Sequence, residues 1–289
     1  MTTIPALTPA EFEAMRQAIE DSPSYRQAFE GLDFVDGANN QPLRLQLELL
    51  KPEWHLQQHH VQSTVVVFGS ARLLPPEQAQ AMFESARKRA RMQPADADLA
   101  QELAQAHQRL CYARYYDEAR RFAAIVSQRF QRERRRDFVV ATGGGPGIME
   151  AANRGAFEVG ARSIGLNITL PREQSPNPYV SPELCFRFHY FAMRKMHFLL
   201  RAKALVAFPG GFGTLDELFD VLALVQTDKV PRIPIILFGE TFWRRAVNFD
   251  FLVETGMISA ADAALVKVVD SAEQAVVVLR NFYDGMPPA

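Results

Sequence analysis

The spacing of apolar and polar residues predicts where strands and helices lie. Short runs of β-branched and other apolar residues are typical of strands that are buried on both faces of a sheet. Five such runs occur, each followed by a turn or loop: STVVVF from 63, DFVVAT from 137, SIGLNITL at 163–170, ALVAF at 204–208 and IPIILF from 233. A sixth segment, CFRFHYF at 185–191, is expected to be extended.

The segments between these runs have helical composition. Residues 75–136 are rich in Ala, Gln, Glu and Arg and must form more than one helix, because soluble helices average about 11–12 residues. We also expect helices at 192–203 and from Thr214 to about Thr227, and two helical stretches after the last strand. LRLQLELL at 43–50 fits helical and alternating spacing equally well.

Alternation of strand and helix predicts an α/β fold. The expected architecture is a Rossmann-like parallel sheet with helices on both faces. Because the alternation starts near Ser63, we predict a nucleotide-binding domain over residues 61–289 and a helical N-terminal extension over residues 1–60.

Composition narrows the class of protein. The chain has 289 residues, a net charge of −1 and two cysteines, so we expect a soluble cytoplasmic protein without a disulfide framework. No secretory signal is recognisable, and no apolar run approaches the ~18 residues that span a bilayer. The basic run RERRRD at 132–137 is interpreted as the end of a helix, so no nucleic-acid partner is expected. The histidines suggest no metal site.

Three glycine turns follow predicted strands: Gly69-Ser70, Gly143–Gly147 and Gly210–Gly213. In a parallel sheet, ligands bind beyond the carboxyl ends of the strands. Glycines let the backbone approach a ligand, and a following helix offers free N–H groups to an anion such as phosphate. Thr214 can add a hydroxyl group. Neither the P-loop spacing nor the dinucleotide-binding spacing is present. One such turn could be a tight connection without a ligand, but three at one edge favour a binding site.

Asp216 and Glu217 are expected in the first turn of the helix that follows the third glycine turn. Acids at this position often interact only with the helix dipole. Alternatively, one of them faces a sugar one group beyond the phosphate. Their spacing does not choose between these interpretations.

Around these residues the chain resembles the LOG family of nucleoside 5′-monophosphate phosphoribohydrolases, once labelled lysine decarboxylases. The resemblance runs from about Ser63 to Asn281 and depends on five motifs in matching order. They are Gly69-Ser70 with Arg72 nearby, the turn from Gly143 to Met149, Glu173 in LPRE, Arg194-Lys195, and the complete signature PGGFGTLDE from Pro209 to Glu217.

The resemblance implies hydrolysis of a nucleoside monophosphate, such as AMP or a cytokinin riboside monophosphate, without a cofactor. Arg194 and Glu217 would be catalytic. A guanidinium stays protonated, so Arg194 would act electrostatically, and Glu217 would stabilise the sugar cation or activate water. The implied substrate-binding residues are Gly69, Ser70, Gly144, Gly145, Met149, Glu173, Lys195, Gly210, Gly211, Gly213 and Thr214. The family also implies a homodimer or a larger homo-oligomer.

Two segments have no counterpart in short members of the family: residues 1–60, and a helical insertion at about 73–112. Two other functions stay open. One is a carrier that binds a nucleotide or the molybdenum cofactor without turnover. The other is an interaction protein that works through its helical extensions. A decarboxylase finds little support, because no lysine lies in a recognisable pyridoxal-phosphate context.

Overall fold

The structure is a computed structural model, and it describes residues 37–132, 134–169 and 175–285 together with positions 10, 16, 17, 21, 25 and 35. The chain forms two compact units, residues 1–51 and 52–289. Helix α3 (Gln41–Gln58) includes the last described residues of the first unit and the first residues of the second. The predicted division at residue 60 stays a prediction.

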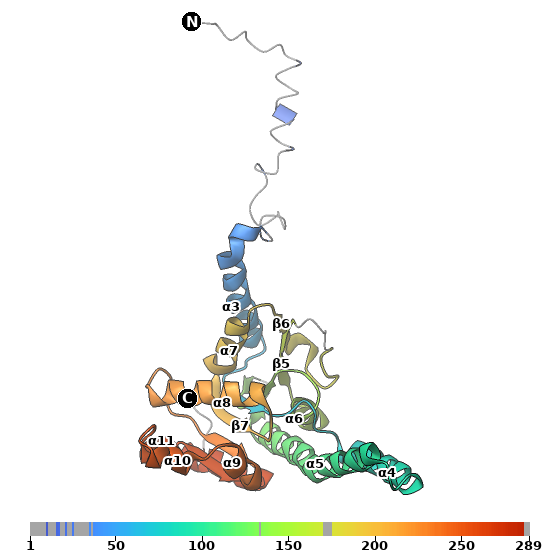
Figure 1. Cartoon of the computed structure of the whole chain (residues 1–289). Helices are drawn as coiled ribbons and strands as arrows, with labels where there is room; N and C mark the ends of the chain where they lie inside the picture. Colours follow the sequence, from blue (N-terminus) through green and yellow to red (C-terminus); the bar gives the residue numbers. More distant parts are fainter. Residues whose placement is uncertain are drawn as a thin grey trace, which may run out of the picture. The chain divides into compact units, whose positions relative to one another are not determined.

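The second unit is built on a seven-stranded sheet in which all neighbouring strands are parallel. The strand order is β6-β5-β4-β1-β7-β8-β9. The predicted α/β fold with a parallel sheet is therefore confirmed (Figure 1). The strands are β1 (Thr64–Phe68), β4 (Val139–Thr142), β5 (Ser163–Ile168), β6 (Cys185–Phe188), β7 (Ala202–Ala207), β8 (Ile235–Phe238) and β9 (Val266–Val269).

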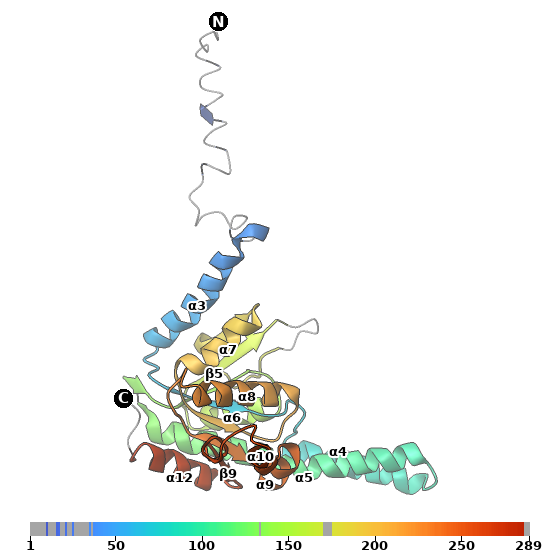
Figure 2. The same ribbon diagram turned by 60° about the vertical axis from the view of Figure 1, so that its left-hand side comes forward.

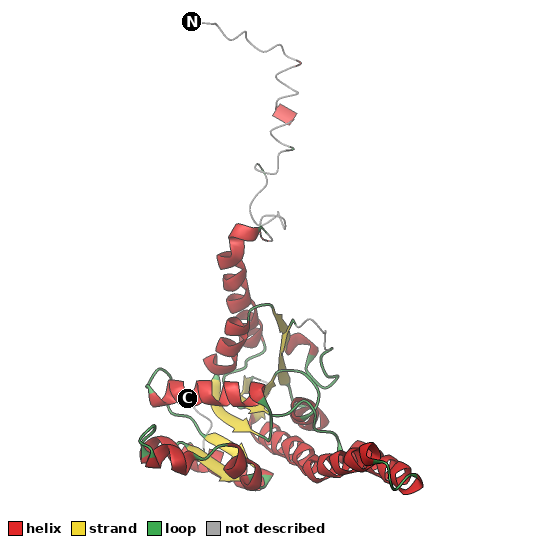
Figure 3. Cartoon of the chain, in the orientation of Figure 1, coloured by secondary structure: helices red, strands yellow, loops and turns green. Residues whose placement is uncertain are grey.

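Helices cover both faces of the sheet, as Figure 3 shows. The helices of this unit are α4 (Pro76–Met92), α5 (Ala97–Phe130), α6 (Ile148–Glu158), α7 (Phe191–Leu200), α8 (Phe212–Gln226), α9 (Glu240–Ala246), α10 (Phe249–Glu254), α11 (Ala260–Ala263) and α12 (Ala272–Phe282). Along the part of the chain that the structure describes, no helix is long and apolar enough to cross a membrane.

Strand β1 shows how the two faces are filled. Side chains alternate across a strand, so Val65 and Val67 join a core with α5, α6 and α12. Val66 and Phe68 face a second core, to which α7, α8 and α9 contribute. All five residues of the strand are buried. This two-sided burial explains why the run is continuously apolar rather than alternating.

The segment between β1 and β4 forms a helical hairpin. Helix α4 packs along the first part of α5 (Figure 2). Between these helices the rings of Phe83 and His107 lie 5.6 Å apart between centroids, and Arg89 pairs with Glu102. The second part of α5 packs on α6. There a Cβ on Gly155 would overlap the carbonyl oxygen of Arg120, so the two helices touch backbone to backbone.

Several sequence expectations were wrong in detail. The helix expected at 192–203 ends at Leu200, and β7 already begins at Ala202, two residues before the predicted strand. The ambiguous segment 43–50 is helical. The basic run at 132–137 does not end a helix: α5 stops at Phe130, and β2 (Gln131–Arg132) pairs antiparallel with β3 (Arg135–Arg136).

The largest error is strand β9, which falls where only helices were expected. It is a four-residue strand at the edge of the sheet, with Lys267 and Val268 exposed. Its alanine-rich neighbours read as helix, and a strand this short has too few residues to show its own period. Pairing with β8 decides its conformation.

Replacing Gly155 by alanine should destabilise the protein. Alanine normally favours a helix over glycine by about 1 kcal/mol, but here the methyl group would push α5 and α6 apart. We expect a loss of about 1–3 kcal/mol in the free energy of unfolding, measured by urea denaturation. Arg120→Ala is the control, because it removes only the partly exposed pair with Glu158. Equal stability of Gly155→Ala and the wild type would contradict the close helix contact.

Candidate functional site

The three predicted glycine turns meet at the carboxyl ends of β4, β1 and β7. Strand β1 lies between the other two, so the turns after these strands are neighbours. They border one pocket of about 640 Å³. Its lining residues are Phe68, Gly69, Ser70, Ala71, Arg72, Gly143, Met149, Ile168, Phe191, Arg194, Gly211, Phe212, Gly213, Thr214, Leu215, Asp216 and Glu217. The sequence prediction of a shared edge is therefore confirmed.

Helix α8 points its amino end into this pocket. It begins at Phe212, two residues earlier than predicted, and its first turn holds no acid. The expectation that Asp216 and Glu217 lie in the first turn was wrong, since both fall in the second turn. The first turn of α8, which a phosphate would meet, therefore carries no negative side chain.

The backbone at this helix start is open to a ligand. The N-cap residue Gly211 provides no side-chain hydrogen bond, so the first N–H groups of α8 keep their capacity to donate. Cβ atoms added at Gly211 or Gly213 would meet nothing within 4 Å. Glycine at these two positions is therefore not required by packing, and its effect is to leave space beside the free N–H groups. That arrangement suits a phosphate.

Arg194 enters the pocket from α7. Its Nε donates to the carbonyl oxygen of Leu166 at 2.9 Å, and its guanidinium lies 5.3 Å from the ring centroid of Phe198. Burial lowers the pKa of Arg194, and the nearby Glu217 carboxylate partly offsets this shift. An arginine pKa lies so far above neutrality that the group stays charged. Arg194 thus presents a fixed positive charge.

Glu217 lies opposite, on α8. Its Oε1 is 3.7 Å from Nη2 of Arg194, and each side chain is only 13% exposed. Burial raises the pKa of Glu217 to about 7, although Arg194 acts in the opposite direction. A carboxyl with this pKa can hold or release a proton near neutral pH.

Lys195 is placed differently from its neighbour Arg194. Its Nζ lies 2.9 Å from Oδ1 of Asp216 and 3.3 Å from Oδ2 of Asp220. These two acids raise the pKa of Lys195 despite some burial. Lys195 does not line the main pocket but borders a small hollow together with Glu217 and Asp220, so its predicted substrate contact stays a prediction.

Eight of the predicted residues do line the pocket: Gly69, Ser70, Met149, Arg194, Gly211, Gly213, Thr214 and Glu217. Gly144 and Gly145 lie behind its wall, and Gly210 packs against the side chain of Thr214. Glu173 lies outside the described residues. Sequence reasoning missed Phe191 and Phe212 as lining residues, because exposed aromatic side chains give no periodic signal. In the described ranges, no group of three or more His, Cys, Asp or Glu is placed to hold a metal ion.

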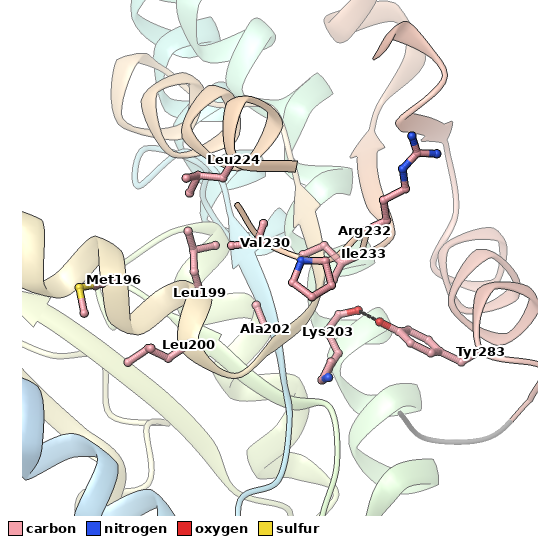
Figure 4. Close-up of a pocket in the computed structure, with 11 residues that line it drawn as sticks. Met196, Leu199, Leu200, Ala202, Lys203, Leu224, Val230, Arg232, Ile233 and Tyr283 are labelled. Atoms are coloured by element: carbon pink, nitrogen blue, oxygen red, sulfur yellow. Dashed lines mark hydrogen bonds between the residues drawn. The ribbon is translucent and has the colours of Figure 1, made fainter. Parts of the chain in front are cut away.

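A second hollow, of about 680 Å³, lies at the amino ends of the strands, beside the start of β7 (Figure 4). Leu199, Leu224 and Val230 surround it, and the hydroxyl of Tyr283 donates to the carbonyl oxygen of Lys203 at 2.6 Å. No carboxylate and none of the predicted site residues line it. Its lining is mainly apolar and includes Lys203 and Arg232 but no carboxylate, whereas Glu217 lies in the first pocket.

The pKa of Glu217 gives a pH-dependent stability. Because the folded-state pKa of about 7 lies above the ordinary 4.5, its contribution is full below pH 4.5 and is lost as pH rises through 7. The free energy of unfolding of Glu217→Gln, measured relative to that of the wild type, should therefore be roughly 1–3 kcal/mol higher at pH 8 than at pH 5. Thermal unfolding at both pH values measures this gain.

The exposed Glu254→Gln is the matched control for this measurement and should show no such gain. A Glu217→Gln difference that stays constant with pH, or reverses, would contradict the raised pKa.

Comparison with known proteins points to one family. Residues 149–279 match a family model described as "possible lysine decarboxylase". The chain is 27% identical over 147 residues to cytokinin riboside 5′-monophosphate phosphoribohydrolase LOG1 of Arabidopsis thaliana, covering 50% of this chain and 68% of the relative. It is 28% identical to a probable LOG4 enzyme of Oryza sativa subsp. japonica, covering 48% of this chain and 60% of that protein.

Two solved structures also match this chain over most of their own length. The protein TM1055 has a TM-score of 0.44 at 19% identity, covering 76% of this chain and 99% of the other. A Moco carrier protein from Chlamydomonas reinhardtii has a TM-score of 0.43 at 17% identity, covering 78% of this chain and 99% of the other.

The family model covers the third glycine turn together with Arg194 and Glu217, and curated relatives that carry the LOG name match about half of the chain. The chain resembles the LOG family, and the resemblance includes the helices that carry Arg194 and Glu217.

Proposed function

We propose that this protein hydrolyses the N-glycosidic bond of nucleoside 5′-monophosphates, releasing free base and ribose 5-phosphate. The observation that carries the proposal is the buried pair of Arg194 and Glu217 beside the open amino end of α8. The relatives named phosphoribohydrolases support the same chemistry. Their names concern a cytokinin riboside monophosphate, and for this chain AMP and that nucleotide are both candidate substrates.

In this proposal the phosphate binds the N–H groups at Gly211, Phe212 and Gly213. Glu217 lies five residues beyond Phe212, which is about 7.5 Å along the helix axis at about 1.5 Å per residue. A ribose extending from the phosphate would reach Glu217 over such a span. Holding the phosphate at the helix tip would thus position the sugar carbon against the carboxylate.

Glu217 would act on the attacking water. The water oxygen bonds to C1′ as the bond from C1′ to the base nitrogen breaks, and the bonding electron pair leaves with the base. The ionised carboxylate accepts the proton of the water and stabilises the positive charge that develops on the sugar. The base then gains a proton as it departs. A pKa of about 7 leaves Glu217 suited to both accepting and returning that proton.

Arg194 would supply charge and orientation rather than proton transfer. Its Nε is engaged by Leu166, so its Nη groups, one of which lies 3.7 Å from Oε1 of Glu217, would be the ones to face ligand oxygens. The half-exposed Phe191 and the almost fully exposed Phe212 flank the opening, where a planar base would find apolar contact. The cytoplasmic location expected from the sequence is part of the proposal as well.

Incubation with AMP, GMP, CMP, UMP, dAMP and isopentenyladenosine monophosphate, followed by chromatography, should reveal a released base. Glu217→Gln should lower the rate at least about a hundredfold, because it removes the carboxylate that accepts a proton from water and leaves the shape of the side chain unchanged. Arg194→Lys should lose a similar factor, since lysine cannot reproduce the planar guanidinium.

Glu254→Gln, on the exposed surface of α10, is the matched control and should keep full activity. Binding of AMP without release of base from any of these nucleotides would refute the hydrolase and support the carrier alternative.

We also propose a homodimer in which α7 and α8 meet a second copy. Apolar side chains on these helices are exposed: Phe191, Met196 and Leu200 on α7, and Phe219 on α8. Met196 and Leu200 also line the apolar hollow of Figure 4, so the exposed surface continues into a concave one. Apolar patches of this kind commonly mark protein interfaces.

Light scattering should show a dimer for the wild type and a shift to monomer for Leu200→Glu, because the new charge would be buried against the partner. Met257→Glu, at an exposed apolar residue outside α7 and α8, should leave the dimer intact. A wild type that remains monomeric at working concentration would exclude this interface.

A further inference from the structure

Three buried polar side chains lie behind the wall of the first pocket. Thr142 ends β4, Asn153 belongs to α6, and Asn177 follows β5 in the chain. Thr142 and Asn153 are 0% exposed, and Asn177 is 7% exposed. Buried polar groups are costly unless they are hydrogen-bonded, so their presence requires a structural or functional reason.

The three side chains form a network whose donors and acceptors match. Thr142 Oγ1 donates to Asn153 Oδ1 at 2.8 Å, and Asn177 Nδ2 donates to the same oxygen at 2.9 Å. Asn153 Nδ2 is directed to the carbonyl oxygen of Ile164, at 3.4 Å. Asn177 Oδ1 accepts from the backbone N–H of Tyr179. Each side-chain oxygen accepts at least one hydrogen bond, and all three side chains donate.

The network also holds the second glycine turn. The N–H of Gly144 donates to Thr142 Oγ1 at 2.9 Å, and the carbonyl oxygen of Gly144 accepts from the backbone N–H of Asn177 at 2.8 Å. Asn177 Nδ2 donates to the carbonyl oxygen of Gly145 at 3.0 Å. Three hydrogen bonds therefore fix the path of the chain just after Gly143.

Gly143 is the point at which this turn touches Arg194. A Cβ on Gly143 would lie 2.8 Å from Nη2 of Arg194 and 2.9 Å from Sδ of Met149. The guanidinium therefore rests against the glycine backbone with no room to move toward it. On its other side, Arg194 Nε is bound to Leu166, two residues along β5 from Ile164, which pairs with Asn153.

We propose that Thr142, Asn153 and Asn177 are positioning residues for Arg194. By fixing the turn at Gly143–Gly145, they fix the surface against which the guanidinium lies, and so its distance from Glu217. None of the three lines the pocket, so they would act through Arg194 and not on substrate. The kinetic consequence rests on the proposed hydrolase function, whereas the effect on Arg194 itself does not.

A pair of substitutions at Thr142 separates positioning from packing. Thr142→Val keeps the volume and loses the hydroxyl, whereas Thr142→Ser keeps the hydroxyl and loses a methyl group. Since a displacement of about 1 Å can cost a hundredfold in rate, we expect Thr142→Val to lower kcat at least about tenfold. KM should change less than about threefold, because the helix tip that binds phosphate is untouched. Thr142→Ser, which keeps the hydroxyl, should have a kcat within about threefold of the wild-type value.

Ser63→Ala is the matched control for lost buried hydrogen bonds. Ser63 is 1% exposed, and its Oγ bonds Asp137 and the backbone N–H of Phe138 near the opposite ends of the strands. The Ser63→Ala variant should lower the melting temperature about as much as Thr142→Val does, and it should leave kcat unchanged. If kcat falls equally in both variants, or Thr142→Ser fails to restore it, the positioning role is overturned.

A second readout does not depend on activity. Hydrogen exchange at the Nε–H of Arg194, followed by NMR and assigned with Arg194→Lys, reports how firmly the guanidinium is held. Exchange should be roughly tenfold faster in Thr142→Val than in the wild type and Ser63→Ala. Equal exchange in all three would overturn the inference. A wild type without hydrolytic activity would instead refute only the proposed function, since the exchange comparison would still decide the role of the network.

Discussion

The site depends on the position of β1 at the centre of a parallel sheet. In such a sheet all carboxyl ends lie at one edge, and β1 has β4 on one side and β7 on the other. The chain first moves outward from β1 through β4, β5 and β6, and then returns to place β7 against the free side of β1. The turns after β4, β1 and β7 must therefore be adjacent, and the helix that follows β7 begins among them. A pocket with three glycine-rich walls is a consequence of this strand order.

Within that pocket the structure retains a buried pair of opposite charges. Burial is unfavourable for the charged forms of both Arg194 and Glu217. It lowers the pKa of Arg194 and raises the pKa of Glu217. Their separation of 3.7 Å offsets only part of this cost. Nearby, Lys195 pairs with both Asp216 and Asp220 and offsets part of their negative charge, and the remainder adds to the raised pKa of Glu217. A fold seldom keeps such a pair for stability alone, which is consistent with a functional origin.

The helical hairpin of α4 and α5 has a structural connection to the site. The second half of α5 lies against α6 with backbone contact at Gly155, and Tyr116 donates a 2.8 Å hydrogen bond to Glu150 of α6. Helix α6 carries Met149 at the pocket and Asn153 in the buried network. A segment that the sequence showed only as helical and rich in Ala, Gln, Glu and Arg thus supports the helix that follows the second glycine turn.

The sequence by itself determined the sheet, the helices around it and the three turns, because buried parallel strands are continuous apolar runs and glycines mark their ends. It also pointed to two candidate site residues, Glu217 through the signature and Arg194 through the separate Arg-Lys motif. It could not place β9, since four residues at an edge carry no period of their own. Only the tertiary structure decided that α8 starts at Phe212, that Lys195 turns to Asp216 and Asp220, and that Thr142, Asn153 and Asn177 meet behind Gly143. These outcomes depend on contacts between residues distant in the chain, and such contacts leave no local pattern.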